Sequence, residues 1–104
     1  MSRIVSVYAV FADGDEAHRI ARTIVEGKLA ACANILGPCR SIYRWQGAVE
    51  EAAEVAAIFK ARADKAEALT ARIAELHSYD VPAIAVWPIE HAWPAYAQWV
   101  EADG

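Results

Sequence analysis

The sequence predicts an α+β fold built from a strand, a helix, two strands, a second helix and a fourth strand, followed by a short final helix. Three observations support this prediction. Short apolar runs rich in β-branched and aromatic residues alternate with segments whose apolar residues recur at helical spacing. Glycine, proline and aspartate separate these segments. The chain of 104 residues has no linker or low-complexity stretch, so we expect one domain spanning residues 1–104.

The first strand and the first helix carry the clearest patterns. Residues 4–11 form a short apolar run that is typical of a buried strand. Asp13 precedes Glu16 by three residues, which is the spacing of a helix N-cap and the carboxylate that returns to it. Gly27 is expected to end this helix or to lie in its last turn. The helix carries one apolar stripe, which consists of Ala17, Ile20, Ala21 and Ile24.

The middle of the chain predicts a pair of strands. Apolar residues 29–36 and 41–45 flank Gly37-Pro38, and proline occurs in strands mainly at edges and bulges, so this segment is either one kinked strand or two collinear strands. Gln46-Gly47 suits a hairpin turn, and residues 54–62 predict the next strand. The core side of that strand is expected to present Val55, Ala57, Phe59 and Ala61, and its other side Glu54, Ala56, Ile58, Lys60 and Arg62.

The last third of the chain shows similar helix and strand patterns. Asp64 and Glu67 have the spacing of a second N-cap, and the helix that they begin should end near His77. Residues 81–89 predict a fourth strand, and residues 94–101 predict a short final helix. The buried stripe of the second helix is expected to contain Ala66, Leu69, Ile73 and Leu76.

This order of elements is the split βαβ, or ferredoxin-like, arrangement. Right-handed crossovers place both helices on one face of a four-stranded antiparallel sheet, and the other face has no cover within the chain. We expect Tyr8, Ile58 and either Ile42 or Tyr43 to line this open face. A sheet with an uncovered apolar face and a long hairpin favours self-association.

Composition also favours self-association. Hydrophobic residues make up 57% of the chain, and 24 alanines explain part of this excess. Four Trp, four Tyr and two Phe are many for a domain that buries about two thirds of its unfolded surface, so some rings should remain accessible as an interface or a ligand groove. The net charge of −4 argues against a generic nucleic-acid binder.

Targeting signals are not apparent in the sequence. No apolar run reaches the length of about 20 residues that spans a bilayer, and no small-residue cleavage site follows the apolar start of the chain. We therefore expect a cytoplasmic protein without a membrane partner.

Few residues suggest metal or acid–base chemistry. Cys32 and Cys39 are seven residues apart, which in a straight strand puts them on opposite faces, so we expect free thiols. Their spacing matches no common zinc or redox signature. We interpret His18 and His91 as surface residues, whereas His77 either caps the helix end or acts as a ligand or in proton transfer.

Acidic and aromatic residues leave further alternatives open. The acidic residues Glu50, Glu51 and Glu54 are interpreted as a solvated turn that could also hold a hard cation weakly. The chain has no Gly-rich phosphate loop and no nucleophile triad, so no catalytic residue is predicted. A core or interface, or else a small-molecule pocket, is expected from Tyr43, Trp45, Tyr79, Trp87, Trp93 and Trp99.

Four segments resemble the CutA divalent-cation tolerance proteins, in order and at the right separations. These segments are KLAACANIL (28–36), SIYRWQG (41–47), HSYDVP (77–82) and PIEH (88–91), followed by Tyr96 and Trp99. The resemblance covers nearly the whole chain. It implies a ferredoxin-like fold assembled as a homotrimer, similar in plan to the PII-like signalling proteins, with a role in tolerance to copper and other divalent cations and without enzymatic activity.

The resemblance also implies a candidate ligand site in clefts between subunits. By position, this cleft would draw on Tyr43, Trp45, Lys60, His77, Tyr79 and Glu90. The resemblance implies, for some family members, copper ligands that include a thiol in the first strand and a second histidine. This chain has Ala9 or a neighbouring residue and Leu76 at those positions, so that only His77 remains. Ala83 stands where the family usually has Glu, and Ser78, Ala92 and Ala61 are further departures.

Three functions follow from these observations. The first is a trimeric, non-catalytic module of metal-ion response, with copper or another divalent cation as its candidate ligand and room for an unidentified protein partner. The second is direct copper binding through His77, with Cys32 or Cys39 as candidate thiolates. The third is a small hydrolase of acylphosphatase-like fold, which the acidic loop 12–15 disfavours because it would repel phosphate.

Overall fold

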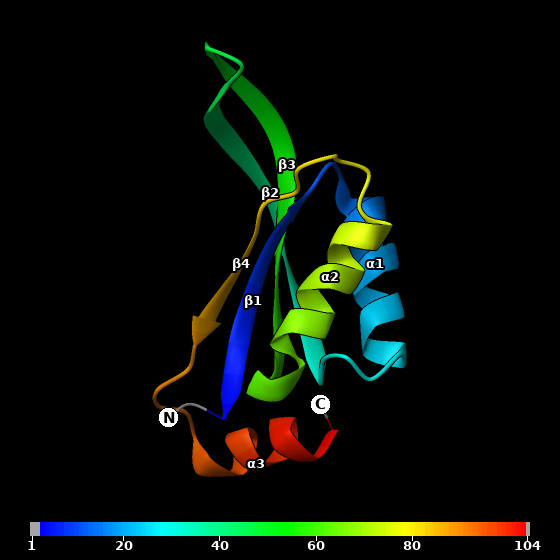
Figure 1. Ribbon diagram of the computed structural model, residues 1–104, viewed down its shortest axis with the longest axis vertical. Helices are drawn as coiled ribbons and strands as arrows, with labels where there is room; N and C mark the ends of the chain where they lie inside the picture. The colour runs from blue at the N-terminus through cyan, green and yellow to red at the C-terminus, as the bar shows by residue number, and fades with distance from the viewer. Residues whose placement is uncertain (1–2, 104) are drawn as a thin grey trace.

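Four strands and three α-helices lie within residues 3–103, the part of the chain that the computed structural model describes (Figure 1). They form one antiparallel sheet in the order β2-β3-β1-β4, which confirms the predicted α+β, ferredoxin-like fold. The elements are β1 (Ile4–Phe11), α1 (Gly14–Glu26), β2 (Cys32–Trp45), β3 (Ala48–Arg62), a 3₁₀ turn (Ala63–Lys65), α2 (Ala66–Leu76), β4 (Ile84–Pro88) and α3 (Pro94–Asp103).

The core lies between the sheet and the helices α1 and α2, which cover the same face (Figure 1). Phe11 of β1 and Phe59 of β3 are fully buried and meet edge to face, with 6.5 Å between their ring centroids. Ile20, Ile24 and Ile73 of the helices are fully buried against them. Each such side chain stabilises the fold by about 1.5–3 kcal/mol relative to an exposed one. The predicted apolar stripe of α1 is therefore confirmed.

The start of α1 has the predicted cap, with one difference. The Asp13 side chain accepts a hydrogen bond from the Glu16 backbone N–H at 2.8 Å, as expected of an N-cap. The Glu16 carboxylate, however, accepts from the backbone N–H of Ala12 at 2.9 Å rather than from that of Asp13. Gly27 ends the helix and donates its N–H to the carbonyl of Thr23, so the predicted end is confirmed.

The segment around Gly37 is one continuous strand with a bulge. Ile35 pairs with Ala57 and Gly37 pairs with Ala56, so Leu36 is an additional residue without a partner on β3. Gly37 has a φ of 97°, a conformation that glycine adopts at low cost. Of the two alternatives left open by the sequence, the single kinked strand is correct.

The bulge changes the prediction for the two cysteines. Cys32 lies opposite Lys60 and Cys39 lies opposite Glu54, and these two β3 residues are an even number of positions apart. Both thiols therefore lie on the same face of the sheet, and the expectation of opposite faces is wrong. Their partners are six positions apart on β3, which is about 20 Å of strand. The thiols are free, as predicted.

The hairpin of β2 and β3 extends beyond the rest of the sheet (Figure 1). Gln46 and Gly47 have φ values of 49° and 84° and form the tight turn that the sequence predicts. β3 begins at Ala48, six residues before the predicted start, and its first part pairs only with β2 because the pairing with β1 ends at Val55. This extension gives the molecule its long dimension of 44 Å.

Two predicted boundaries near α2 need correction. Asp64 does not cap the helix but lies in the 3₁₀ turn, where its carboxylate accepts two hydrogen bonds from Arg62 at 3.0 and 2.7 Å. The hydrogen bond from Arg62 lowers the pKa of Asp64. The regular part of β4 begins at Ile84 rather than at residue 81, because Pro82 has no N–H to donate to a strand partner.

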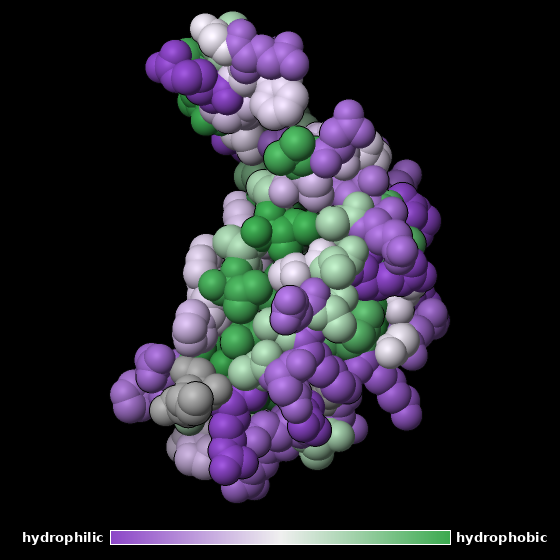
Figure 2. All heavy atoms as spheres, in the orientation of Figure 1, coloured by the Kyte–Doolittle hydropathy of each residue, from purple (hydrophilic) through white to green (hydrophobic). Residues whose placement is uncertain are grey.

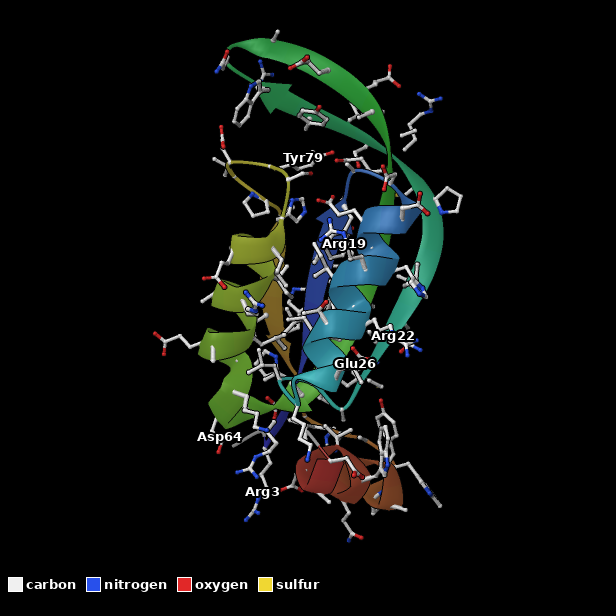
Figure 3. All side chains as sticks on the ribbon, turned by 90° about the vertical axis from the view of Figure 1, so that its right-hand side faces the viewer. Arg3, Arg19, Arg22, Glu26, Asp64 and Tyr79 are labelled. Atoms are coloured by element: carbon white, nitrogen blue, oxygen red, sulfur yellow. The ribbon has the colours of Figure 1, made fainter. Side chains whose placement is uncertain are left out.

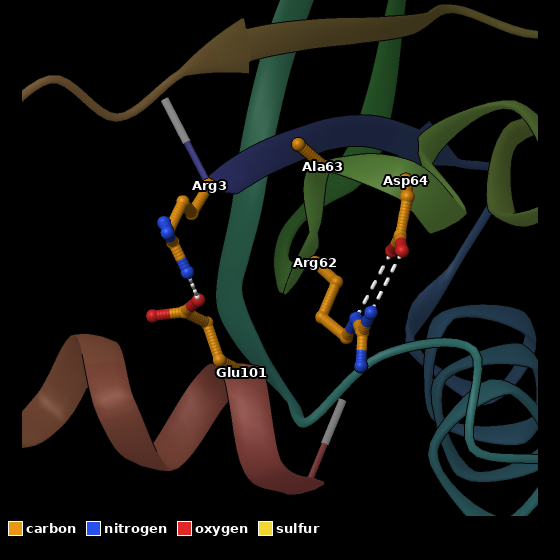
Figure 4. Close-up of a pocket in the computed structure, with 5 residues that line it drawn as sticks. All are labelled: Arg3, Arg62, Ala63, Asp64 and Glu101. Atoms are coloured by element: carbon orange, nitrogen blue, oxygen red, sulfur yellow. Dashed lines mark hydrogen bonds and ion pairs between the residues drawn. The ribbon is translucent and has the colours of Figure 1, made fainter. Parts of the chain in front are cut away.

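The helix α3 packs at the end of the sheet where β1 begins. Val100 is fully buried, and the exposed pair of Arg3 and Glu101, 3.3 Å apart, joins α3 to the chain before β1 (Figure 4). This pair and that of Arg62 with Asp64 line a shallow pocket of about 470 Å³ (Figure 4). Because the pairs are exposed to water, they contribute little to stability.

The sheet face opposite α1 and α2 is mostly open, as predicted. Tyr8 and Ile58 are direct cross-strand partners on this face, and Tyr43 rather than Ile42 lies on it, because Tyr43 pairs with Glu50. The face is not entirely uncovered, since the hydroxyl of Tyr96 in α3 lies 3.6 Å from the sulfur of Cys32, which is on this face. On another side of the molecule, where β4 and α2 face the viewer, Figure 2 shows a band of hydrophobic residues between the hairpin and α3. Large exposed apolar residues of the described chain are Ile35, Leu36, Ile42, Tyr43, Trp45, Val49, Tyr79, Val81, Val86, Trp87, Trp93 and Trp99.

Candidate ligand-binding site

The buried polar residues of the described chain form one connected cluster. Glu16, Glu54 and His77 expose only 6%, 8% and 9% of their surface. They come from α1, β3 and the end of α2, and they meet through Ser78 and Tyr79 in the loop that follows α2. Buried charged groups cost free energy unless they are hydrogen-bonded, so each contact in this cluster is structurally important.

Both ring nitrogens of His77 are engaged in hydrogen bonds. The Nε2 atom lies 2.7 Å from the carbonyl oxygen of Val10 and must donate to it, because a carbonyl can only accept. The Nδ1 atom accepts from the backbone N–H of Tyr79 at 3.0 Å. This pair of bonds requires the neutral ring with its proton on Nε2. The ring also stacks on Phe11, with 5.1 Å between centroids. His77 thus connects the α2–β4 loop to the end of β1.

Glu16 joins the same loop to the start of α1. Its second carboxylate oxygen accepts from the Ser78 backbone N–H at 2.8 Å. Burial by itself raises the pKa of Glu16, but the hydrogen bonds from Ala12 and Ser78 outweigh that effect, so the pKa lies below its ordinary value. The carboxylate therefore stays ionised at neutral pH and accepts two backbone N–H groups that would otherwise lack partners.

Tyr79 connects the loop to the hairpin. Its hydroxyl donates to the Glu54 carboxylate at 2.8 Å. Burial, this hydrogen bond and the charge of Glu54 raise the pKa of Tyr79 to about 12. The phenol therefore remains protonated and continues to donate over the physiological pH range. Figure 3 shows Tyr79 in the loop below the overhanging hairpin.

A cleft of about 780 Å³ lies between this loop, the open face of the sheet and the hairpin. Its walls combine aromatic rings with carboxylates, which is the character of a site for a small polar ligand. The residues that line it are Tyr8, Val10, Ser41, Tyr43, Arg44, Trp45, Glu50, Glu54, Tyr79, Asp80, Val81 and Ala83.

The structure divides the predicted site residues into two groups. Tyr43, Trp45 and Tyr79 line the cleft, and His77 lies directly behind Tyr79, with 4.8 Å between their ring centroids. Lys60 and Glu90 lie at the other end of the sheet. Lys60 pairs with Ser6 near the start of β1, and Glu90 follows Ile89, whose N–H donates to the carbonyl of Ile4. A single chain therefore does not bring the six residues together.

Glu54 is the cleft residue whose role the sequence concealed. The interpretation of Glu50, Glu51 and Glu54 as a solvated turn is wrong, because all three lie in β3 and Glu54 is buried. The sequence contains no local sign of this burial, since Glu54 is covered by residues that are distant along the chain. Five further cleft residues are not singled out by the sequence: Val10 of β1, Ser41 and Arg44 of β2, and Asp80 and Val81 of the loop after α2. Ala83, which departs from the family pattern, also lines the cleft.

The residues proposed as metal ligands are separated from one another. Within residues 3–103, no group of three or more His, Cys, Asp and Glu side chains could hold a metal ion. Cys32 lies beside Tyr96, with 3.6 Å between Sγ and the hydroxyl oxygen, whereas Cys39 lies across from Glu54. A metal at His77 would have to displace one of its two backbone hydrogen bonds.

Among the described residues, no helix combines the length and the apolar character that crossing a bilayer requires.

Comparisons with known proteins agree with this fold. A model of the family described as "CutA1 divalent ion tolerance protein" matches residues 5–103. The divalent-cation tolerance protein CutA of Pyrococcus horikoshii is 41% identical over 97 residues, which cover 93% of this chain and 94% of that protein.

Two solved structures are also similar to this chain. The crystal structure of CutA from Xylella fastidiosa superposes with a TM-score of 0.95 at 29% identity and covers 98% of both chains. The structure of CutA from Archaeoglobus fulgidus, which is described as a periplasmic divalent-cation tolerance protein, gives a TM-score of 0.90 at 36% identity and covers 93% of this chain and 94% of that chain. Sequence and fold thus agree over nearly the full length, and the chain belongs to the CutA1 family of divalent ion tolerance proteins.

Proposed function

We propose that this protein is a non-catalytic homotrimeric module of PII-like plan that acts in tolerance or response to divalent metal ions, copper among them. The family supports the link to divalent cations. We further propose that the cleft described above is completed between subunits and binds a small ligand there. The cytoplasm is the compartment that we propose, although the Archaeoglobus relative is described as periplasmic.

The observation that carries this proposal is the open sheet face with its overhanging hairpin. Trp45 and Trp87 expose 46% and 49% of their surface, although tryptophan is a residue that proteins usually cover. Tyr8 stacks on Trp87 on the same face, with 5.3 Å between ring centroids. Further copies of the chain, with the same apolar face, would remove these rings from water and cover the strand edges.

The division of the predicted site residues supports a cleft between subunits. Tyr43, Trp45 and Tyr79 line the cleft of one chain, whereas Lys60 and Glu90 lie at the other end of the sheet. Lys60 and Glu90 could reach the cleft only from a neighbouring copy. A trimer would then bring together residues that each chain alone keeps apart.

Light scattering after gel filtration tests the assembly. We expect a particle of three times the 11.3 kDa chain mass at micromolar concentration. A monomer with an unchanged circular dichroism spectrum would refute the trimer. The role in tolerance is tested in a host that lacks its own copy, by comparing growth in copper with the wild-type chain and with Trp45→Ala. Unchanged growth on adding the wild-type chain would refute the role.

A further inference from the structure

Glu54 and Lys60 place opposite charges on the open sheet face. Alternation along β3 puts Glu54, Ala56, Ile58 and Lys60 on that face, because Ile58 is the partner of Tyr8 there. The two charges therefore flank a pair of apolar residues. They are six positions apart, which is about 20 Å of strand, so a single chain keeps them from meeting.

Neither of these two charges belongs to an ion pair among the described residues. Glu54 exposes 8% of its surface and accepts a hydrogen bond from the neutral hydroxyl of Tyr79. Lys60 is half-buried within the paired strands β1, β2 and β3. Arg62, two positions further along β3, does have a partner, since it pairs with Asp64 at 2.7 Å. Buried charges are normally paired, so both Glu54 and Lys60 are unmatched in the single chain.

A cyclic trimer brings different regions of the same surface together. Each interface in such an assembly is heterologous, which means that one region of a copy contacts another region of the next copy. Glu54 lies where the hairpin leaves the sheet, because the pairing of β3 with β1 ends at Val55, and Lys60 lies near the other end, opposite Ser6. Packing of this face against a neighbour can therefore place the Lys60 end of one copy at the Glu54 end of the next. Glu54 also lines the cleft, so a side chain of the neighbour has access to it.

We infer that the Glu54 carboxylate of each copy forms an ion pair with the Lys60 ammonium group of a neighbouring copy. This inference rests on the proposed trimer and identifies a residue that the neighbour contributes to the cleft. Tyr79 is a positioning residue in this scheme, because its hydroxyl occupies one oxygen of Glu54 at 2.8 Å and leaves the other for the ammonium group. The cleft is then complete only in the assembled protein, and assembly neutralises its buried carboxylate.

A double-mutant cycle tests this ion pair. It compares the wild-type protein, Glu54→Gln, Lys60→Gln and the variant with both substitutions. Light scattering over a dilution series measures the chain concentration at which half of the protein is trimeric, in a urea concentration at which wild-type trimers dissociate in the micromolar range. Circular dichroism of the trimeric samples confirms the fold. Effects of substitutions more than about 10 Å apart normally add, so non-additivity between two residues about 20 Å apart in one chain reports a contact between copies.

We expect each single substitution to raise this concentration at least about tenfold, because it leaves the remaining charge unpaired at the interface. The double substitution should weaken the trimer no more than the more damaging of the two single ones. Arg44→Gln is the matched control, since Arg44 is a cation that the chain itself contributes to the cleft. Its effect should add to that of Glu54→Gln.

The outcomes distinguish this inference from the proposed function. Additive effects of Glu54→Gln and Lys60→Gln on a protein that remains trimeric would overturn the ion pair and leave the proposed function intact. A monomeric wild-type protein would overturn the trimer and the ion pair with it. Coupling of Glu54 to Arg44 in place of Lys60 would assign the carboxylate to the hairpin and also overturn the inference.

A variant of Lys60 alone decides the question if Glu54→Gln does not fold. Lys60→Glu places a second carboxylate against Glu54 of the neighbouring copy. It should therefore weaken the trimer at least about tenfold more than Lys60→Gln does. Equal weakening by the two Lys60 variants would overturn the ion pair.

Discussion

Replacing Glu16 by Gln is the sharpest test of the buried polar cluster. Both carboxylate oxygens accept backbone N–H groups, from Ala12 at 2.9 Å and from Ser78 at 2.8 Å. Glutamine has one oxygen, so its amide NH₂ must face one of these two donors. A hydrogen bond to a charged group contributes about 1.5–3 kcal/mol, and an unsatisfied buried donor costs about 1–3 kcal/mol. Because the neutral amide is cheaper to bury, we expect a net loss of about 2–4 kcal/mol in the free energy of unfolding.

The pH dependence of this loss has a definite sign. The pKa of Glu16 is lower in the folded protein than its ordinary value of 4.5, so ionised Glu16 stabilises the fold above that pH. This contribution is lost as the pH falls through the folded pKa. Wild-type protein and Glu16→Gln should therefore differ most at neutral pH and converge in acid.

Urea unfolding followed by circular dichroism measures both effects. The variants must be compared at equal protein concentration, because assembly raises apparent stability. Glu26→Gln is the matched control, since Glu26 is an exposed residue of the same helix and pairs with exposed Arg22. It should change stability by less than about 0.5 kcal/mol. A loss below about 0.5 kcal/mol for Glu16→Gln at neutral pH, or a loss that does not diminish in acid, would refute the reasoning.

Three further predictions concern the bulge, the loop and the buried histidine. Gly37→Ala should destabilise the fold by about 1 kcal/mol in urea unfolding because of its φ of 97°, whereas Gly14→Ala should be neutral or stabilising; equal effects would contradict this. In an absorbance titration of the tyrosines, Tyr79→Phe should lack one ionisation step near pH 12 that the wild-type protein shows. If the missing step lies near pH 10 instead, the result would be inconsistent with the hydrogen bond between Tyr79 and Glu54. His77→Ala should lower stability by about 2–4 kcal/mol and leave copper binding by electron paramagnetic resonance unchanged, because both ring nitrogens are occupied; loss of the copper signal would make His77 a ligand.

The same capping pattern occurs twice in the sequence but forms a helix cap only once. Asp13 and Asp64 both precede a glutamate by three residues, yet only Asp13 caps a helix. The Asp64 carboxylate is engaged by Arg62, two residues earlier, and α2 begins without a side-chain cap. The spacing shows that a carboxylate could cap the helix. Whether it does so or binds a nearby side chain such as Arg62 depends on the path of the backbone.

The alternation of strand residues is reliable only while the strand is regular. It placed the core residues of β3 correctly, among them Phe59 and Ala57, which are fully buried. It failed for Cys32 and Cys39, because one additional residue at Leu36 shifts every later side chain to the other face. A bulge is decided by pairing with a distant strand, so periodicity within one strand does not reveal it.

The sequence by itself determined the order of the elements, the apolar faces of the helices and the family. Apolar periodicity and sequence motifs depend only on residues that are close together along the chain. Only the tertiary structure decided which polar residues became buried. Glu54 appears in the sequence as part of an acidic turn, and it becomes the buried carboxylate of a cleft because Tyr79, 25 residues away, closes over it. The same holds for His77, whose ring is committed to the carbonyl of Val10, 67 residues earlier. Burial and charge compensation depend on contacts between distant segments, and such contacts exist only once the chain has folded.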